Sequence, residues 1–206
     1  MYRPRAFAVD DVALLRKFIR ERTFATVALA VNGRVLFAYT PAVLDGDGLG
    51  CLRFHLAKAN PVCAAADGAD LNISFLGGDA YISPDWYATQ GRVPTWNYMA
   101  VEACGRARKL SREGLHKLLV DISADQENRL LPKPPWLIGK VGKSKLEGLL
   151  NAIEGFEVVL EKLEGKFKLS QNVGPADIDG AIAGLEARGD ARSAAIADAM
   201  KSLRPG

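Results

Sequence analysis

An Asn-Gly pair at residues 32–33 separates two apolar, strand-forming runs, FATVALAV and RVLFAYTPAVLD. Both positions of such a two-residue turn need positive φ angles, which asparagine and glycine tolerate best. The pair therefore predicts a β-hairpin over residues 24–45. A second turn, DGDG, leads into another strand at about 50–55. Closely spaced antiparallel strands of this kind predict a small barrel.

Further strands and helices follow from the hydrophobic spacing along the chain. Residues 70–78 and 99–110 have strand character, and so does the alternating segment 156–172. Residues 56–67 have the composition of a helix, which we expect Pro61 to interrupt. Strands of this number with scattered helical segments predict an α+β protein.

The expected helices have recognisable N-caps. Apolar residues at helical spacing in 12–22 follow Asp10 and Asp11, and Ser111 precedes a second helix. The proline-rich connector LPKPPW separates that helix from another at about 144–155. The tail at about 177–203 contains two short Ala-rich helices, and Asp190 is the expected cap of the second. No linker divides residues 1–206, so we expect one domain with a C-terminal helical tail.

The composition excludes several classes of function. Hydrophobic residues make up 49% and charged residues 25%, as in ordinary globular proteins. A net charge of +3, with basic and acidic residues interleaved, does not favour direct DNA binding. Three cysteines without CxxC spacing and two histidines predict no metal site. No apolar stretch approaches the roughly 20 residues that span a bilayer, and we expect a cytoplasmic protein without membrane contact.

Residues 80–98, AYISPDWYATQGRVPTWNY, concentrate the aromatic side chains of the chain. They include three of its five tyrosines and two of its three tryptophans, together with Pro84 and Pro94. The prolines exclude a regular helix and favour a rigid loop. Such a loop either presents aromatic faces to a ligand or closes the end of a barrel, and local chemistry alone leaves both alternatives open.

The heptapeptide HLAKANP at residues 55–61 directly follows an expected strand. His55, Lys58 and Asn60 supply hydrogen-bond donors and positive charge within a short segment, which suits a phosphate monoester. Taken singly, His55 is as well explained by a structural histidine, and Lys58 by a solvated lysine. The motif as a whole favours phosphate binding.

These segments also carry a family resemblance. Residues 80–98, HLAKANP, EGKFKLSQN at 164–172 and the opening MYRPRAF resemble the PaiB-type family of FMN-binding negative transcriptional regulators. The resemblance extends from residue 1 to about 200. It implies an FMN-binding split β-barrel, antiparallel, with peripheral and C-terminal helices. It also implies a homodimer that holds the flavin in a groove built by both subunits.

The resemblance implies a set of cofactor contacts. The strand-to-helix segment with His55, Lys58 and Asn60 would hold the flavin phosphate. The strand end at Tyr39 and Thr40 would meet the flavin ring or its ribityl chain. Trp96 would stack on the ring and Asn97 would hydrogen-bond to it, while Lys168 and Gln171 would line the site or the dimer interface.

Two positions depart from the family pattern, and they keep other functions open. Tyr39 and Glu102 stand where relatives more often have histidine, and tyrosine cannot replace histidine in proton transfer near neutral pH. An FMN-dependent or haem-dependent oxidoreductase is one alternative, with His55 as the candidate haem ligand. A dimeric relative without a cofactor is another. The sequence identifies no catalytic residue.

Overall fold

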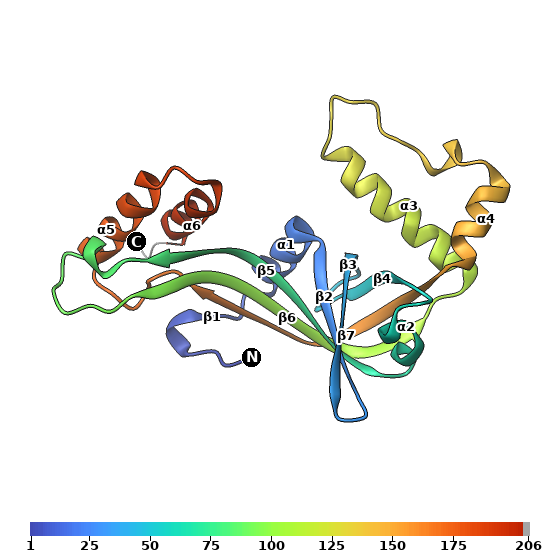
Figure 1. The fold of residues 1–206 in the computed structure, drawn as a ribbon, viewed down its shortest axis with the longest axis horizontal. Coiled ribbons are helices and arrows are strands. Elements are labelled where there is room, and N and C mark those ends of the chain that lie inside the picture. The colour runs from blue at the N-terminus through green and yellow to red at the C-terminus, as the bar shows by residue number, and fades with distance from the viewer. Residues whose placement is uncertain (204–206) are drawn as a thin grey trace. The chain divides into compact units, whose positions relative to one another are not determined.

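The computed structural model describes residues 1–203 and contains one sheet and a set of helices (Figure 1). The helices of the N-terminal and middle regions are η1 (Arg5–Phe7), α1 (Val12–Arg22), α2 (Pro61–Ala66), η2 (Pro84–Trp86), α3 (Arg112–Asn128), η3 (Ile138–Lys140) and α4 (Lys143–Asn151). The C-terminal helices are α5 (Pro175–Ala187) and α6 (Ala191–Ser202). The strands are β1 (Ala8–Val9), β2 (Phe24–Val31), β3 (Arg34–Asp45), β4 (Cys51–Ala57), β5 (Asp70–Ile82), β6 (Thr95–Lys109) and β7 (Ile153–Lys168).

The strands form a closed antiparallel sheet. Their order is β1-β7-β4-β3-β2-β5-β6, and an additional pairing of β7 with β6 closes the sheet into a barrel. The β2–β3 hairpin has the predicted turn, since Asn32 and Gly33 both have positive φ, at 48° and 75°. The predicted α+β class with an antiparallel barrel is therefore confirmed.

The chain divides into two compact units, each built from separate segments. The first comprises Met1–Asp11, Leu76–Val101 and Glu164–Gly206, and the second comprises Val12–Phe75 and Glu102–Leu163. Strands β5, β6 and β7 contribute residues to both units. The expectation of a single domain stays a prediction.

The second unit has an aromatic and aliphatic core on one face of its strands. Phe54 of β4 and Phe156 of β7 are opposite each other in the register, and their ring centroids are 5.8 Å apart. Phe75 and Leu52 are equally buried. Burying side chains of this size contributes about 1.5–3 kcal/mol each to folding. The opposite strand face carries Arg53 and His55 on β4 and the exposed side chains of Phe37 and Tyr39 on β3.

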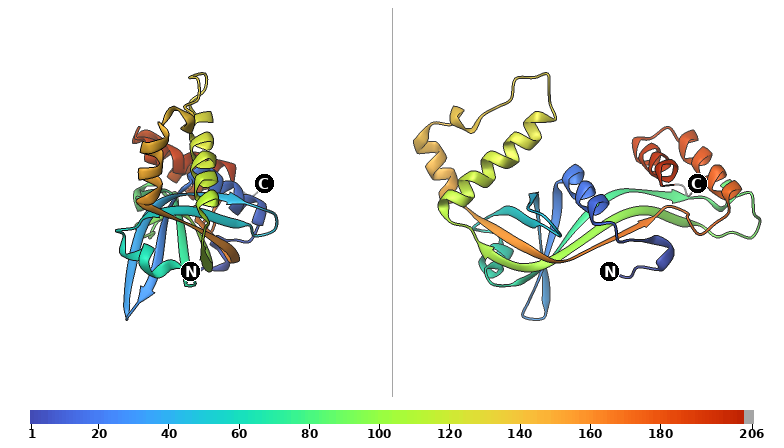
Figure 2. Two further views of the ribbon diagram at one scale, coloured as in Figure 1. Left: turned by 90° about the vertical axis from the view of Figure 1, so that its right-hand side faces the viewer. Right: turned by 180° about the vertical axis from the view of Figure 1, so that it is seen from behind.

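The first unit is organised by the α5–α6 helical pair, which lies over the adjoining ends of β5 and β6 (Figure 2). Ile196 of α6 is fully buried and lies 3.5 Å from the Cβ position of Gly78 on β5. Asp190 caps α6 by accepting a hydrogen bond from the Ser193 amide, as predicted. Trp86 of η2 packs directly on α5, where Gly180 and Gly184 leave room for it.

Three sequence-based expectations need correction. Pro61 does not interrupt a helix: it is the first residue of α2, because a missing N–H costs nothing in the first turn. Residues 56–57 belong to β4 instead. The aromatic segment 80–98 is not a loop throughout, since β5 runs to Ile82 and β6 begins at Thr95. The loop is confined to residues 83–94.

Candidate functional site

His55 lies on the outer face of the strands of the second unit, the face opposite the core. Side chains alternate along β4, so that Phe54 and Leu56 enter the core while His55 points to the opposite face together with Arg53. The imidazole is half-buried, and its Nδ1 atom is buried without a hydrogen-bond partner. Burial lowers the pKa of His55, which keeps the ring neutral at pH 7. A neutral imidazole with an unpaired nitrogen can accept or donate one hydrogen bond to a ligand.

Tyr39 and Thr40 have different environments because successive residues of β3 alternate in direction. Thr40 is buried, and its hydroxyl donates to the carbonyl oxygen of His55 at 2.8 Å. This bond ties β3 to β4 and uses the hydroxyl structurally. Tyr39 is 66% exposed on the same side of the sheet as His55. Of the two residues, only Tyr39 presents its polar group to solvent.

Lys58 lies just beyond β4 and belongs to a group of charged residues that the sequence does not reveal. Its Nζ atom is 3.1 Å from Oε1 of Glu154, whose Oε2 atom is 2.8 Å from Nζ of Lys109. These three side chains line a cavity of about 300 Å³ with Cys63, Asp67 and Phe156. The hydrogen bond from Lys109 lowers the pKa of Glu154 and raises that of Lys109. One carboxylate therefore bridges two ammonium groups at the mouth of this cavity.

The structure does not bring His55 and Lys58 together. Glu154 occupies the position on β7 opposite Leu56, and the neighbouring Gly155 is opposite His55. Because neighbours on a strand face opposite ways, the Glu154 carboxylate and the Lys58 ammonium lie on the core side, whereas the imidazole points to the other side. A single phosphate held by both side chains is therefore not supported by the geometry of this unit.

Asn60 has a structural role at the start of α2. Its side-chain oxygen accepts a hydrogen bond from the amide of Val62 at 2.9 Å, which makes Asn60 the N-cap of that helix. Such a cap contributes about 1 kcal/mol to stability. A contact between Asn60 and a cofactor would have to use the amide nitrogen, and it stays a prediction.

In the first unit, Trp96 is the predicted contact that remains accessible. It is 54% exposed and lies edge-on to Tyr81, with ring centroids 6.0 Å apart. A tryptophan held by a neighbouring ring and open on its other side offers a flat surface for stacking. The structure leaves it available for the predicted role.

The other predicted contacts of the first unit are engaged within it. Asn97 is completely buried, and its amide donates to Ser170 Oγ at 2.9 Å and approaches the sulfur of Met200 at 3.4 Å. Gln171 bonds to the backbone of its own segment, accepting from Leu169 at 2.7 Å. Lys168 donates to the hydroxyl of Thr95. Their contact with a cofactor stays a prediction.

A cavity of about 160 Å³ lies between the aromatic loop and the end of β7 in this unit. Lys168, Thr95, Tyr87 and Arg92 contribute to its lining. The structure thus brings together the two motifs, residues 80–98 and 164–172, that the sequence analysis singled out. Small-molecule sites usually measure about 300–1,000 Å³, so this cavity alone does not hold a whole flavin nucleotide.

The aromatic loop is also fixed to α5. Asp177, which is almost fully buried, accepts from the amide of Thr89 at 2.8 Å and pairs with Arg92 at 2.5 Å. Trp86 packs on the same helix. This part of the loop therefore has a structural role. Of the two alternatives for the aromatic segment, packing within the fold applies to Trp86, whereas Trp96 remains exposed.

Sequence reasoning missed Lys109 and Glu154, and no spacing pattern would have found them. Glu154 lies almost a hundred residues beyond Lys58 in the sequence, and only the register of β4 with β7 brings the two side chains together. Glu102, the second departure from the family pattern, lies half-buried on β6.

Residues 1–162 match the family described as "Putative FMN-binding domain". The chain is 29% identical to "Protease synthase and sporulation protein PAI 2" of Bacillus subtilis, over 98% of this chain and 97% of the relative. It is 30% identical to an uncharacterized protein of Emericella nidulans over 98% and 96% of the two chains.

Solved structures of low identity share the fold. A FAD and heme binding protein from Mycobacterium smegmatis superposes with a TM-score of 0.60 at 16% identity, covering 86% of this chain and 79% of its own. The flavocytochrome Anf3 from Azotobacter vinelandii gives 0.58 at 18%, covering 85% and 73%. No helix within residues 1–203 has the length and apolar character needed to cross a membrane.

Proposed function

Because this chain belongs to the FMN-binding domain family, we propose that it binds FMN and seats the cofactor phosphate at the cavity between Lys58 and Lys109. The observation that supports this assignment is that Lys58 and Lys109 both pair with the Glu154 carboxylate beside a cavity of about 300 Å³. A phosphate monoester satisfies both cations better than a single carboxylate does, because it carries more charge and three acceptor oxygens.

Glu154 must give up at least one of its cations when the phosphate enters. Lys58 and Lys109 are about half exposed, so their ion pairs with Glu154 are screened by water. Ion pairs of this kind contribute little to stability, and they rearrange readily. Glu154 thus holds the two lysines in place without binding them tightly.

The flavin ring would be held by groups on other surfaces. In the second unit, His55 offers an unpaired Nδ1 on the face opposite Lys58, and Tyr39 is a further candidate. The cofactor contacts of Trp96 and Lys168, which belong to the first unit, stay a prediction. The ring supplies redox chemistry when bound, and these side chains would orient it and exclude water.

We infer that the complete site needs a second copy of the chain. Val35, Phe37 and Tyr39 are each more than half exposed on one face of β3, and Phe24 is exposed on the same face of β2. A contiguous exposed apolar face is rare on monomeric proteins and marks an interface. A homodimer formed through this face would cover Tyr39 and bring residues of the partner chain to the His55 side of the sheet.

The regulatory role follows the family resemblance and the Bacillus subtilis relative, which is named a protease synthase and sporulation protein. We propose that this cytoplasmic protein acts through its cofactor or a protein partner rather than by direct DNA binding, because its net charge of +3 is small and dispersed. A gel-shift experiment at low salt tests this point. Retardation of DNA that weakens steeply with added salt would contradict it.

Titration of the apo-protein with FMN, followed by flavin fluorescence, tests the phosphate site. Lys58→Ala and Lys109→Ala should each weaken binding roughly tenfold, the loss expected for one charge-assisted hydrogen bond. Lys143→Ala, an exposed lysine of α4, is the matched control and should bind FMN as the parent does. Equal affinities in all three variants would exclude the site. A Soret band in the purified protein would instead favour the haem alternative with His55 as ligand.

A further inference from the structure

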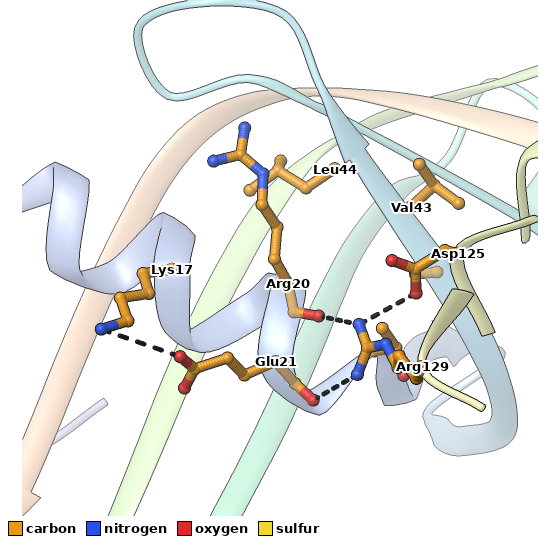
Figure 3. Close-up of a pocket in the computed structure, with 9 residues that line it drawn as sticks. Lys17, Arg20, Glu21, Val43, Leu44, Asp125 and Arg129 are labelled. Atoms are coloured by element: carbon orange, nitrogen blue, oxygen red, sulfur yellow. Dashed lines mark hydrogen bonds and ion pairs between the residues drawn. The ribbon is translucent and has the colours of Figure 1, made fainter. Parts of the chain in front are cut away.

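A second cavity lies in the second unit, between α1, β3 and α3 (Figure 3). Its volume is about 540 Å³, and none of the predicted cofactor contacts lines it. This volume falls inside the range of roughly 300–1,000 Å³ that is typical of small-molecule sites. The cavity is therefore large enough for an organic ligand of one or two fused rings.

The floor of this cavity is the exposed edge of β3. The Ala42 amide donates to the Thr23 carbonyl at 2.8 Å, and β2 pairs with β3 only as far as Phe24 opposite Pro41. In an antiparallel ladder, alternate residues direct their peptide groups to alternate sides. Leu44 therefore directs its N–H and C=O toward the cavity, beside the apolar side chain of Val43. The floor combines an apolar surface with a polar strand edge.

The rim carries three cations, which differ in how far they are already neutralised. Arg129 donates to the carbonyl oxygens of Arg20 at 2.5 Å and Glu21 at 3.0 Å and pairs with Asp125 at 2.9 Å. Lys17 is 3.9 Å from Glu21. Within residues 1–203, the Arg20 guanidinium has neither a hydrogen-bond nor an ion-pair partner, and it extends toward Leu44 (Figure 3). The uncompensated charge of the rim is therefore positive.

The wall of the cavity contains a strained residue. Thr23 ends α1 with its amide bonded to the carbonyl of Ile19 at 2.8 Å, and its φ angle is 53°. Glycine or asparagine usually occupies this position, and a β-branched residue there is an outlier. Such strain concentrates at ligand sites, where the surrounding structure maintains it.

We propose that this cavity binds a planar organic anion, an aromatic carboxylate or a compound of equivalent shape and charge. The ring would lie on the side chain of Val43, beside the strand edge at Leu44, and the carboxylate would pair with the guanidinium of Arg20. The planar fork of arginine matches the two oxygens of a carboxylate, which makes this group a better partner than a point charge.

Isothermal titration with 2-naphthoate tests the proposal, and neutral 2-naphthamide controls for charge. Arg20→Gln should lower naphthoate affinity roughly tenfold, as expected for the loss of one charge-assisted contact. Arg22→Gln is the matched control, since Arg22 on the same helix stacks on Phe18 away from the cavity. Both side chains are exposed, so both variants should fold. Failure of naphthoate to bind the parent, or equal binding by Arg20→Gln, would overturn the proposal.

Repeating the titration on protein saturated with FMN shows whether the natural ligand of this cavity is FMN itself or a separate compound. Displacement of naphthoate by FMN would show that the cavity receives the ring of the cofactor itself. Unchanged naphthoate binding would show that a separate metabolite occupies it. Both results uphold the site. Lys58→Ala separates this proposal from the phosphate assignment, because it should weaken FMN binding and leave naphthoate binding to the FMN-free protein unchanged.

Discussion

Two glycine-to-alanine substitutions in helix interiors should change stability in opposite directions. Alanine is favoured over glycine in a helix by roughly 0.8–1 kcal/mol. Gly148 in α4 has nothing within 4 Å of its Cβ position, so Gly148→Ala should gain about this amount. A Cβ atom on Gly184 of α5 would lie 2.2 Å from the indole ring of Trp86. Overpacking of this kind costs about 1–3 kcal/mol, so Gly184→Ala should lose about 1 kcal/mol net.

Urea denaturation at matched concentrations measures both variants. The sharpest test is the same substitution in a Trp86→Ala background, where the ring is absent. In this background Gly184→Ala should stabilise the protein by roughly 0.8–1 kcal/mol, the preference of alanine over glycine in a helix, because the clash with the indole ring is absent. If Gly184→Ala stabilises the parent as much as Gly148→Ala does, then Trp86 does not pack on α5. In that case the assignment of Trp86 to structure rather than to the ligand would fail.

Three further predictions concern the site and its pH dependence. If the protein forms the homodimer that we propose, Phe37→Glu should sediment as a monomer, whereas Arg5→Glu, a change at an exposed residue, should leave the dimer intact; a dimeric Phe37→Glu variant would exclude this face. Burial lowers the pKa of His55, so the parent should lose stability relative to His55→Gln as pH falls below the ordinary histidine value of about 6.5. A stability difference that is constant between pH 5 and pH 8 would contradict burial of the ring. Glu154→Gln should tighten FMN binding several-fold, because it removes the negative charge that competes with the phosphate for two lysines. Weaker FMN binding by this variant would contradict the prediction and show that the Glu154 carboxylate contributes to binding.

Local chemistry was sufficient to predict the elements whose signals lie within a few residues. Asn32 and Gly33 define the hairpin because few other residues adopt two successive positive φ angles. Ser111 and Asp190 cap the helices that follow them, as expected from their side-chain oxygens. Pro61 is an ambiguous signal, because proline is compatible with the first turn of a helix as well as with its end. The N-cap residue Asn60, directly before Pro61, is the signal that a helix begins there.

The extent of the long strands could not be predicted from local chemistry. Pro94 and the aromatic residues around it suggested a loop, yet β6 begins at Thr95. Trp96 and Tyr98 fit a strand as well as they fit a loop, because aromatic residues are favoured on pleated surfaces. Pairing with neighbouring strands decides between the two, and this pairing depends on residues far away in the sequence.

The same limit applies to the candidate site, and it bears on our proposal that the complete site needs a second copy of the chain. The motif HLAKANP predicts one ligand for His55 and Lys58, since they are three residues apart. His55 points to the outer face of β4, whereas Lys58, just beyond the end of this strand at Ala57, pairs with Glu154, which also pairs with Lys109 and lies opposite the core residue Leu56. We therefore expect a nucleotide bound at Lys58 not to contact His55 of the same chain. If both residues contact FMN, the imidazole must meet a cofactor whose phosphate is held by the other subunit, and mixed dimers of Lys58→Ala with His55→Gln chains would retain one intact site.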